Sequence, residues 1–126
     1  MTGEPGLHVL VADDEPILAL AVGETLKEAG YRVTVTYNGE SAIRSYLCDP
    51  ADVLLTDLQM PLVDGLEVIR QIRAIAPDLP VVVMTGYGTR GALDALRTVM
   101  EGEVIVVTKP MALRDVLRAV QSVRPA

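Results

Sequence analysis

The chain of 126 residues contains no tryptophan or phenylalanine, one histidine and one cysteine. Since half of the residues are hydrophobic and few are aromatic, the core must be built from aliphatic side chains. The single cysteine, Cys48, excludes an internal disulfide and fits a reducing compartment. No histidine lies near it in sequence, so we interpret Cys48 as a partly buried apolar residue at a helix end rather than a nucleophile. The chain also lacks a His or Cys pair that would recruit zinc.

Long apolar runs and basic stretches are missing as well. No run reaches the roughly 18 residues that a membrane-spanning helix needs, and the first six residues lack the basic and apolar regions of a signal peptide. We therefore expect a soluble, cytoplasmic domain without membrane contact. The net charge of −6 argues against a nucleic-acid surface. The length fits a single domain, 1–126, in which only 1–6 and 124–126 are expected to be loose.

Five apolar, β-branched runs alternate with five amphipathic stretches. Such runs are typical of strands covered on both faces and predict a parallel sheet with helices on each side. The alternation predicts a doubly wound α/β domain. Candidate N-caps are Asp14 and Asn38. The expected strands are 8–12, 32–36, 53–56, 81–85 and 104–107, and the expected helices are 16–30, 38–48, 65–76, 90–100 and 113–120.

Charged residues follow three of these strands at the point where each ends. Asp13 and Asp14 follow the first, Asp57 the third and Lys109 the fifth. The carboxyl ends of parallel strands form one edge of the sheet, where ligands bind. Two carboxylates about 5 Å apart repel each other by roughly 3 kcal/mol at an effective dielectric constant near 20, so three of them need a cation. Mg²⁺ prefers such oxygen ligands. Singly, Asp14 could just cap a helix and Asp57 just open a turn; together they predict a magnesium site with one carboxylate free to react.

Lys109 is one of only two lysines, against nine arginines. Its compact ammonium can reach a phosphate or a carboxylate as a point charge, and Pro110 after it favours a cis peptide bond. Thr85 ends the fourth strand, where its hydroxyl could donate to an oxyanion beside Gly86. On position alone, a hydroxyl that bonds to the local backbone is the simpler interpretation of Thr85.

Four segments together resemble the receiver domain of two-component response regulators over nearly the whole chain. They are VLVADDEP at 9–16, LLTDLQMPLVDG at 54–65, VVVMTGYG at 81–88 and VVTKP at 106–110. The resemblance implies a flavodoxin-like sheet of order 2-1-3-4-5 with five helices. It also implies roles for the site residues: Asp57 as phosphoryl acceptor, Asp14 as a direct and Asp13 as a water-mediated Mg²⁺ ligand, the backbone carbonyl of Gln59 as a further ligand, and Thr85 and Lys109 as partners of the phosphoryl oxygens.

The same resemblance implies a mechanism and partners. A histidine kinase or a histidine phosphotransfer protein would donate its phosphoryl group to Asp57, and the domain would promote its own modification and reset without being an independent turnover enzyme. The strand 104–107 with helices 90–100 and 113–120 would form the face for a downstream effector. The chain could be a free-standing or N-terminal receiver, or the receiver module of a hybrid sensor histidine kinase.

Val106 is the clearest departure from the family. It stands three residues before Lys109, where the family has an aromatic residue that turns inward on phosphorylation. Valine is too short for this rotation, so we expect the backbone and helix 90–100 to carry the signal, or an unconventional output. Tyr87 could supply the aromatic ring or shield the acyl phosphate from water, and Gln59 could tune dephosphorylation.

The sequence leaves three alternatives to a phosphorylated receiver domain. A haloacid-dehalogenase-type phosphotransferase needs a second Asp two residues after the nucleophile, where this chain has Gln59. A flavin- or nucleotide-binding domain needs a phosphate-cradling loop after the first strand, where Asp13, Asp14 and Glu15 would repel a phosphate. A receiver whose switch has decayed into a constitutive interaction module is favoured only by Val106.

Overall fold

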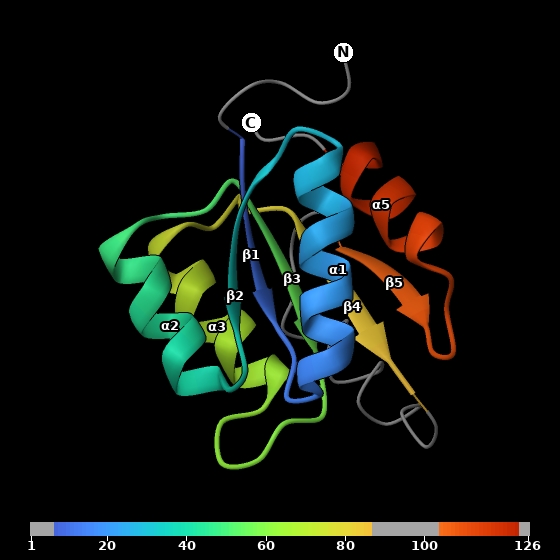
Figure 1. The fold of residues 1–126 in the computed structure, drawn as a ribbon. Coiled ribbons are helices and arrows are strands. Elements are labelled where there is room, and N and C mark those ends of the chain that lie inside the picture. Colours follow the sequence, from blue (N-terminus) through green and yellow to red (C-terminus); the bar gives the residue numbers. More distant parts are fainter. Residues whose placement is uncertain (1–6, 87–103, 124–126) are drawn as a thin grey trace.

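The computed structural model describes residues 7–86 and 104–123, which form a five-stranded parallel sheet (Figure 1). The strand order is β2-β1-β3-β4-β5, so the predicted order is confirmed. The strands are β1 His8–Ala12, β2 Arg32–Thr36, β3 Val53–Asp57, β4 Val81–Thr85 and β5 Val104–Thr108. The third and fifth strands each extend one residue beyond their predicted ends, which brings Asp57 into regular strand pairing with β4.

Four helices lie within the described ranges: α1 Pro16–Glu28, α2 Gly39–Cys48, α3 Gly65–Ile75 and α5 Leu113–Ser122. Each matches a predicted helix. The predicted helix at 90–100 lies outside the described residues. None of the described helices is long and apolar enough to cross a membrane.

The helices cover both faces of the sheet (Figure 1). On one face, Leu54 and its neighbours pack against α2 and α3. On the other, Leu55 and its neighbours pack against α1 and α5. Adjacent residues of one strand point to opposite faces, and both leucines are fully buried. Each leucine anchors one of the two cores, and truncating either to alanine costs about 2–5 kcal/mol in typical cores.

The central strands are buried along their whole length, and the edge strands are covered only in part. All residues of β1, β3 and β4 are buried, whereas β2 and β5 carry half-buried and exposed positions. Val106 of β5 is 40% exposed. The expectation of strands covered on both faces is therefore confirmed for the middle of the sheet and wrong for its edges, where only one neighbouring strand shields the backbone.

The helix ends confirm one predicted cap and correct another. Asn38 caps α2, and its side chain accepts a hydrogen bond from the backbone N–H of Ser41 at 2.8 Å. Asp14 does not cap α1, because Glu15 occupies the cap position without a side-chain hydrogen bond and Pro16 begins the helix. Asp14 thus lies one residue too early to cap and stays at the end of β1.

Cys48 also differs from its prediction. It is the last residue of α2, as expected, but it is exposed rather than partly buried. The helix buries Ala42 and Tyr46 against the sheet. Cys48 follows Tyr46 by two residues, about 200° further around the helix, and so faces away from the core.

Candidate functional site

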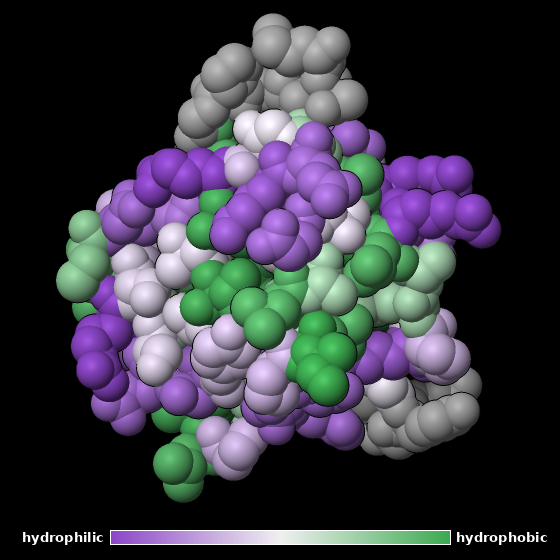
Figure 2. Space-filling view, viewed as in Figure 1, coloured by the Kyte–Doolittle hydropathy of each residue, from purple (hydrophilic) through white to green (hydrophobic). Residues whose placement is uncertain are grey.

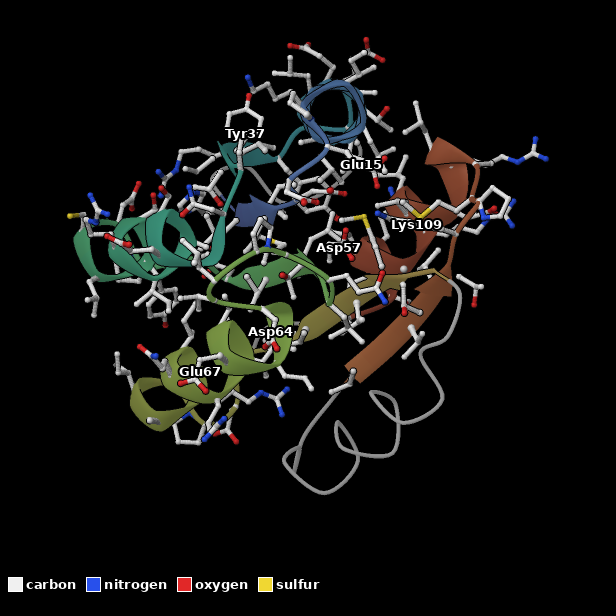
Figure 3. All side chains as sticks on the ribbon, turned by 90° about the horizontal axis from the view of Figure 1, so that it is seen from below. Glu15, Tyr37, Asp57, Asp64, Glu67 and Lys109 are labelled. Atoms are coloured by element: carbon white, nitrogen blue, oxygen red, sulfur yellow. The ribbon has the colours of Figure 1, made fainter. Side chains whose placement is uncertain are left out.

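Of the side chains predicted for the site, those of Asp13, Asp14, Asp57 and Lys109 lie together at the carboxyl edge of the sheet, and Figure 3 shows Asp57 and Lys109 there from below. Asp13 directly follows β1, Asp57 ends β3, Thr85 ends β4 and Lys109 directly follows β5. The strands are parallel and adjacent in the sheet, so their ends lie together although the residues are far apart in sequence. Asp64 and Glu67, at the start of α3, lie apart from this group in the same view.

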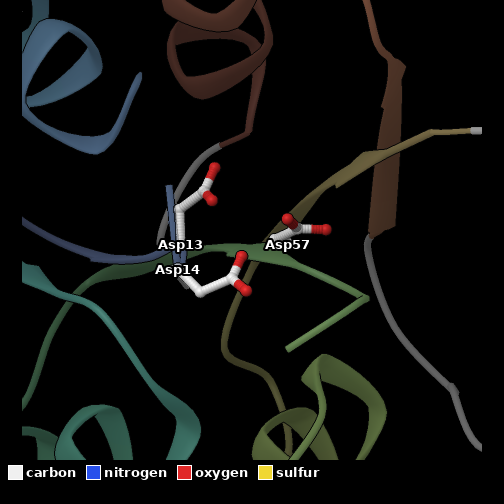
Figure 4. Close-up of side chains that lie close together, drawn as sticks. All are labelled: Asp13, Asp14 and Asp57. Carbon is white, nitrogen blue, oxygen red and sulfur yellow. The ribbon is translucent and has the colours of Figure 1, made fainter. Parts of the chain in front are cut away.

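Three carboxylates meet at this edge (Figure 4). Asp13, Asp14 and Asp57 each offer one oxygen, and these oxygens lie within 4.8 Å of one another. Asp13 and Asp57 are buried, whereas Asp14 is exposed. Burial raises the pKa of Asp13 to about 6, and this outweighs the hydrogen bond from the Glu15 backbone and the charge of Lys109, which lower it. The negative charges of Asp57 and Glu15 raise this pKa further.

The ammonium of Lys109 contacts three carboxylates of the site. Its Nζ donates hydrogen bonds to Asp57 Oδ2 and to Glu15 Oε1, each at 2.9 Å, and lies 3.5 Å from Asp13 Oδ2. Burial alone would lower the pKa of Lys109, but the hydrogen bonds to Asp57 and Glu15 and the nearby negative charges outweigh it, so the pKa is raised. Lys109 is therefore a permanent cation at neutral pH. The predicted cis peptide bond before Pro110 is confirmed.

The backbone orients Asp57. Its Oδ1 accepts a hydrogen bond from the backbone N–H of Gln59 at 3.0 Å, while its Oδ2 faces Lys109. Thr56 Oγ1 donates to the Asp57 carbonyl at 2.9 Å. A Cβ at Gly65 would lie 2.1 Å from that carbonyl oxygen, so only glycine lets α3 begin this close to the end of β3. The carboxylate is thus held by donors on both of its oxygens.

Two buried oxygens in the described part of the chain lack a hydrogen-bond partner, and both belong to the site. They are Asp13 Oδ2 and Thr85 Oγ1. Buried polar atoms are nearly always hydrogen-bonded in folded proteins. Asp13 Oδ2 has only the Lys109 ammonium at 3.5 Å and Thr85 Oγ1 has no partner among the described residues, so both atoms can accept a further group. A cation suits the carboxylate oxygen, and an oxyanion suits the hydroxyl. The simpler interpretation of Thr85, a hydroxyl bonded to the local backbone, is not supported within the described residues.

A pocket of about 830 Å³ opens at the site, over Asp57 and Lys109. Among the described residues, nothing lies within 4 Å of a methyl group added at Gly86, so these residues leave space at this end of β4. The pocket is lined by Asp14, Glu15, Leu18, Asp57, Gln59, Gly86, Lys109, Pro110 and Met111. It can therefore admit a small oxyanion to within reach of Asp57.

Glu15 was expected only to repel a phosphate, but it belongs to the site. It lines the pocket and accepts a hydrogen bond from Lys109. Its position directly after Asp13 and Asp14 could have indicated a site residue. Nothing in the sequence, however, shows that residue 15 turns toward residue 109. Tyr87 lies outside the described residues, and the structure places Val106 on β5, on the same sheet face as Val104.

Comparisons with known proteins agree with this arrangement. Residues 9–121 match the family described as the response regulator receiver domain. The response regulator receiver protein CpdR of Brucella abortus (strain 2308) is 33% identical over 117 residues, which cover 90% of this chain and 93% of that protein. The probable transcriptional regulatory protein TcrX of Mycobacterium tuberculosis is 34% identical over 115 residues, which cover 91% of this chain and 48% of TcrX.

A solved structure matches as well. The receiver domain of the sensor histidine kinase PA1611 from Pseudomonas aeruginosa PAO1 superimposes with a TM-score of 0.78 and 27% identity, over 92% of this chain and 95% of that one. That structure holds a magnesium ion coordinated in its active site cleft. CpdR aside, the chain spans less than half of the length of the first curated relatives that it matches.

Proposed function

Because this chain belongs to the response regulator receiver family, we propose that Asp57 accepts a phosphoryl group from a phosphohistidine of a histidine kinase or a histidine phosphotransfer protein. Members of this family are regulatory domains of two-component signal transduction rather than independent turnover enzymes. The observation that carries the proposal is the Asp57 carboxylate, which lies in an open pocket between a half-buried ammonium and two further carboxylates.

The acidic cluster fits Mg²⁺. Asp13 and Asp14 offer oxygens beside Asp57, and Oδ2 of Asp13, which has no hydrogen-bond partner, supports the binding of a cation there. We assign Asp14 and Asp57 as direct ligands, Asp13 as a ligand through water and the Gln59 carbonyl as a further ligand. When bound, Mg²⁺ supplies positive charge that relieves the repulsion among the carboxylates and stabilises the charge on the transferring phosphoryl group.

The transfer is a displacement at phosphorus. An Asp57 oxygen forms a bond to phosphorus, while the bond between phosphorus and the imidazole nitrogen breaks and leaves its electron pair on that nitrogen. The protein takes little part in the covalent chemistry beyond the Asp57 oxygen, so positioning and charge neutralisation supply most of the rate acceleration. Lys109 exchanges its hydrogen bond with Asp57 for one with a phosphoryl oxygen, and the unpaired hydroxyl of Thr85 donates to another.

The product is an acyl phosphate, which water can hydrolyse by attack at phosphorus with return of the Asp57 carboxylate. The same donors, Lys109 and Thr85, would serve this step, so the domain would promote its own reset. Gln59 lines the pocket and would influence the approach of water. A shielding role for Tyr87 is part of this proposal.

The signal would leave through β4 and β5. Phosphorylation adds about −1.5 to −2 charges beside Thr85, whose carbonyl accepts a hydrogen bond from the Lys109 N–H at 2.6 Å. A pull on the Thr85 hydroxyl therefore moves backbone that is bonded to the end of β5. Val106 is too short to report this by rotation, so the backbone and residues 90–100 would carry the change to an effector on β5 and α5.

The phosphodonor protein would approach over α1. Ile17 and Leu20 of α1 are 87% and 53% exposed, and Leu18 between them lines the pocket. Figure 2 shows hydrophobic residues gathered in the middle of the molecular face that carries α1, with hydrophilic residues around them. A partner that packs on this surface would deliver its phosphohistidine beside Asp57. No direct contact with nucleic acid or membrane is proposed for this domain.

The test is phosphorylation of the purified chain by labelled acetyl phosphate with Mg²⁺. Wild type should incorporate label that is sensitive to alkali, as acyl phosphates are, and Asp57→Asn should not. Asp64→Asn is the matched control, since Asp64 caps α3 away from the pocket. Equal labelling of Asp57→Asn and wild type would show that the acceptor is another residue.

A further inference from the structure

We propose that Glu15 is a specificity-determining residue of the phosphorylation site, which slows phosphorylation by small anionic donors. This inference rests on the proposed function of Asp57. The carboxylate of Glu15 holds the ammonium of Lys109 and places a negative charge at the mouth of the pocket. Both effects oppose an anionic donor that reaches Asp57 without docking elsewhere on the protein.

The geometry divides Lys109 between two carboxylates. Its Nζ lies 2.9 Å from Glu15 Oε1 and 2.9 Å from Asp57 Oδ2. The side chain of Glu15 is 60% exposed, whereas those of Lys109 and Asp57 are 18% and 6% exposed. By exposure, Glu15 therefore stands nearest to solvent and Asp57 deepest, with Lys109 between them, and the three side chains lie close together in Figure 3. A phosphoryl group that enters has to replace one or both of the partners of Lys109.

The charge balance of the site points the same way. Glu15 is the fourth carboxylate beside Asp13, Asp14 and Asp57, and Lys109 is the cation that pairs with three of the four. With all four carboxylates ionised, one ammonium and one divalent cation leave one negative charge uncompensated. Without Glu15 the same site would be neutral. Glu15 thus accounts for the net negative charge of the site that an incoming dianion meets.

The size of the effect follows from Coulomb's law. One charge about 6 Å from a dianionic donor, in water-like surroundings, changes its local concentration by roughly three- to tenfold. A protein donor gains contact energy elsewhere on its partner, so this repulsion matters less to it than to a small molecule. Glu15 would in this way favour phosphorylation by a docked partner over phosphorylation by metabolites of the acyl phosphate class.

The experiment compares rates of phosphorylation by acetyl phosphate in wild type, Glu15→Gln, Glu15→Asp and Glu24→Gln. In each reaction an Asp57 oxygen bonds to phosphorus, and acetate leaves with the electron pair of the broken P–O bond. Intact mass spectrometry follows the product, because the chain has no tryptophan for a fluorescence signal. Mg²⁺ is held at saturation for each variant, so that altered metal affinity does not enter the rates.

Glu15→Gln should raise the rate constant roughly three- to tenfold at low ionic strength and less than about twofold near 0.5 M salt, where the screening length falls to a few ångströms. Glu15→Asp keeps the charge and should stay near wild type. Glu24→Gln removes the same charge from an exposed position of α1 about 13 Å further along the helix, and should change the rate by less than about twofold.

An unchanged or lowered rate in Glu15→Gln would overturn the inference, as would an equal rise in Glu24→Gln, which would indicate an effect of net charge alone. Asp57→Asn is measured in parallel. If Asp57→Asn is labelled like wild type, the proposed function itself fails. If Asp57→Asn is unlabelled and Glu15→Gln reacts like wild type, only the role of Glu15 fails.

Discussion

The ammonium of Lys109 donates a hydrogen bond to the carboxylate of Asp57 over 2.9 Å, although the two residues are 52 positions apart in the chain. The contact joins the end of β3 to the end of β5 across the end of β4. A buried carboxylate is costly without a partner, and a permanent cation beside it offsets that cost. The same cation can pass to an oxyanion once that carboxylate has reacted, so a structural contact becomes a catalytic one.

Replacement of Lys109 should separate stability from phosphorylation. Lys109→Met leaves three carboxylates without their cation and should lower the free energy of unfolding by about 1–3 kcal/mol in EDTA, as measured by urea denaturation. Lys109→Arg keeps the charge and should recover much of this loss, but its wide guanidinium should not restore the rate of phosphorylation. If Lys109→Met is as stable as wild type, the ammonium contributes no net stabilisation.

Asp13 should destabilise the metal-free protein at neutral pH. Its pKa is about 6 in the folded chain against an ordinary 3.8, so the folded state binds the proton more tightly, and stability falls as the pH rises from about 4 through about 6. Asp13→Asn keeps a hydrogen-bond acceptor for the Glu15 N–H without the charge. In EDTA at pH 7.5 the free energy of unfolding of Asp13→Asn should exceed that of wild type by about 1–2 kcal/mol after allowance for solvent screening.

The stability advantage of Asp13→Asn over wild type should disappear near pH 4, where Asp13 of the folded wild type is already protonated. Thermal unfolding of both proteins across this pH range is the measurement. A gain of the same size at both pH values would assign the effect to packing rather than to charge.

Mg²⁺ should stabilise the fold through Asp14. Millimolar Mg²⁺ is expected to raise the melting temperature of wild type, because a ligand that binds only the folded state shifts the unfolding equilibrium. Asp14 is exposed, so Asp14→Ala should cost little stability in EDTA yet lose most of the Mg²⁺-dependent gain. Glu24→Ala, on the same side of the sheet but outside the cluster, should keep that gain. An undiminished gain in Asp14→Ala would remove Asp14 from the ligand set.

Gly65 should tolerate no side chain. In Gly65→Ala the new Cβ would fall 2.1 Å from the Asp57 carbonyl oxygen and 2.8 Å from the Cα of Leu58, both backbone atoms. We expect a loss of about 2 kcal/mol or more, in the range of overpacked cores, and slower phosphorylation because the end of β3 must move. At Gly86 an added Cβ meets none of the described residues within 4 Å, so the stability of Gly86→Ala should lie near that of wild type. Equal stabilities of the two variants would contradict the close approach of α3.

Leu62 should be replaceable with a gain in stability. It is fully exposed and has a φ of 69°, in the left-handed region that disfavours most side chains. Leu62→Asn should raise the free energy of unfolding by about 0.5–1 kcal/mol, since asparagine tolerates this conformation. Leu62→Ile, with a β-branched side chain, should lower it. Urea denaturation of the pair tests this, and a loss of stability in Leu62→Asn would mean that the leucine makes a contact that offsets its backbone strain.

The strands were predictable from the sequence because burial on both faces leaves a run of Val, Leu and Ile that polar residues interrupt only at the ends. The sheet order was confirmed, but it came from the resemblance to receivers rather than from the runs themselves. The cap at Asn38 was predictable because capping is local. The cap at Asp14 was wrong because its neighbour Glu15 takes that position, and a sequence with three acidic residues in a row does not show which one precedes the helix.

Burial at single positions was less predictable. Cys48 is apolar by type and ends a helix, yet its angle around α2 turns it to solvent. Glu15 is an ordinary exposed carboxylate by type, yet it contacts Lys109 from 94 positions away. Both outcomes depend on how a helix is rotated and placed against the sheet, which no local pattern specifies.

The sequence by itself determined which residues stand at strand ends, because hydrophobic burial and alternation of elements are written along the chain. From this followed the parallel sheet, the acidic edge and the family. Only the tertiary structure decided how the charges are paired: one ammonium is hydrogen-bonded to Asp57 and Glu15 and lies 3.5 Å from Asp13, and the Thr85 hydroxyl has no hydrogen-bond partner among the described residues. Electrostatic energy varies with distances of a few ångströms between segments that are remote in sequence, and the fold sets those distances.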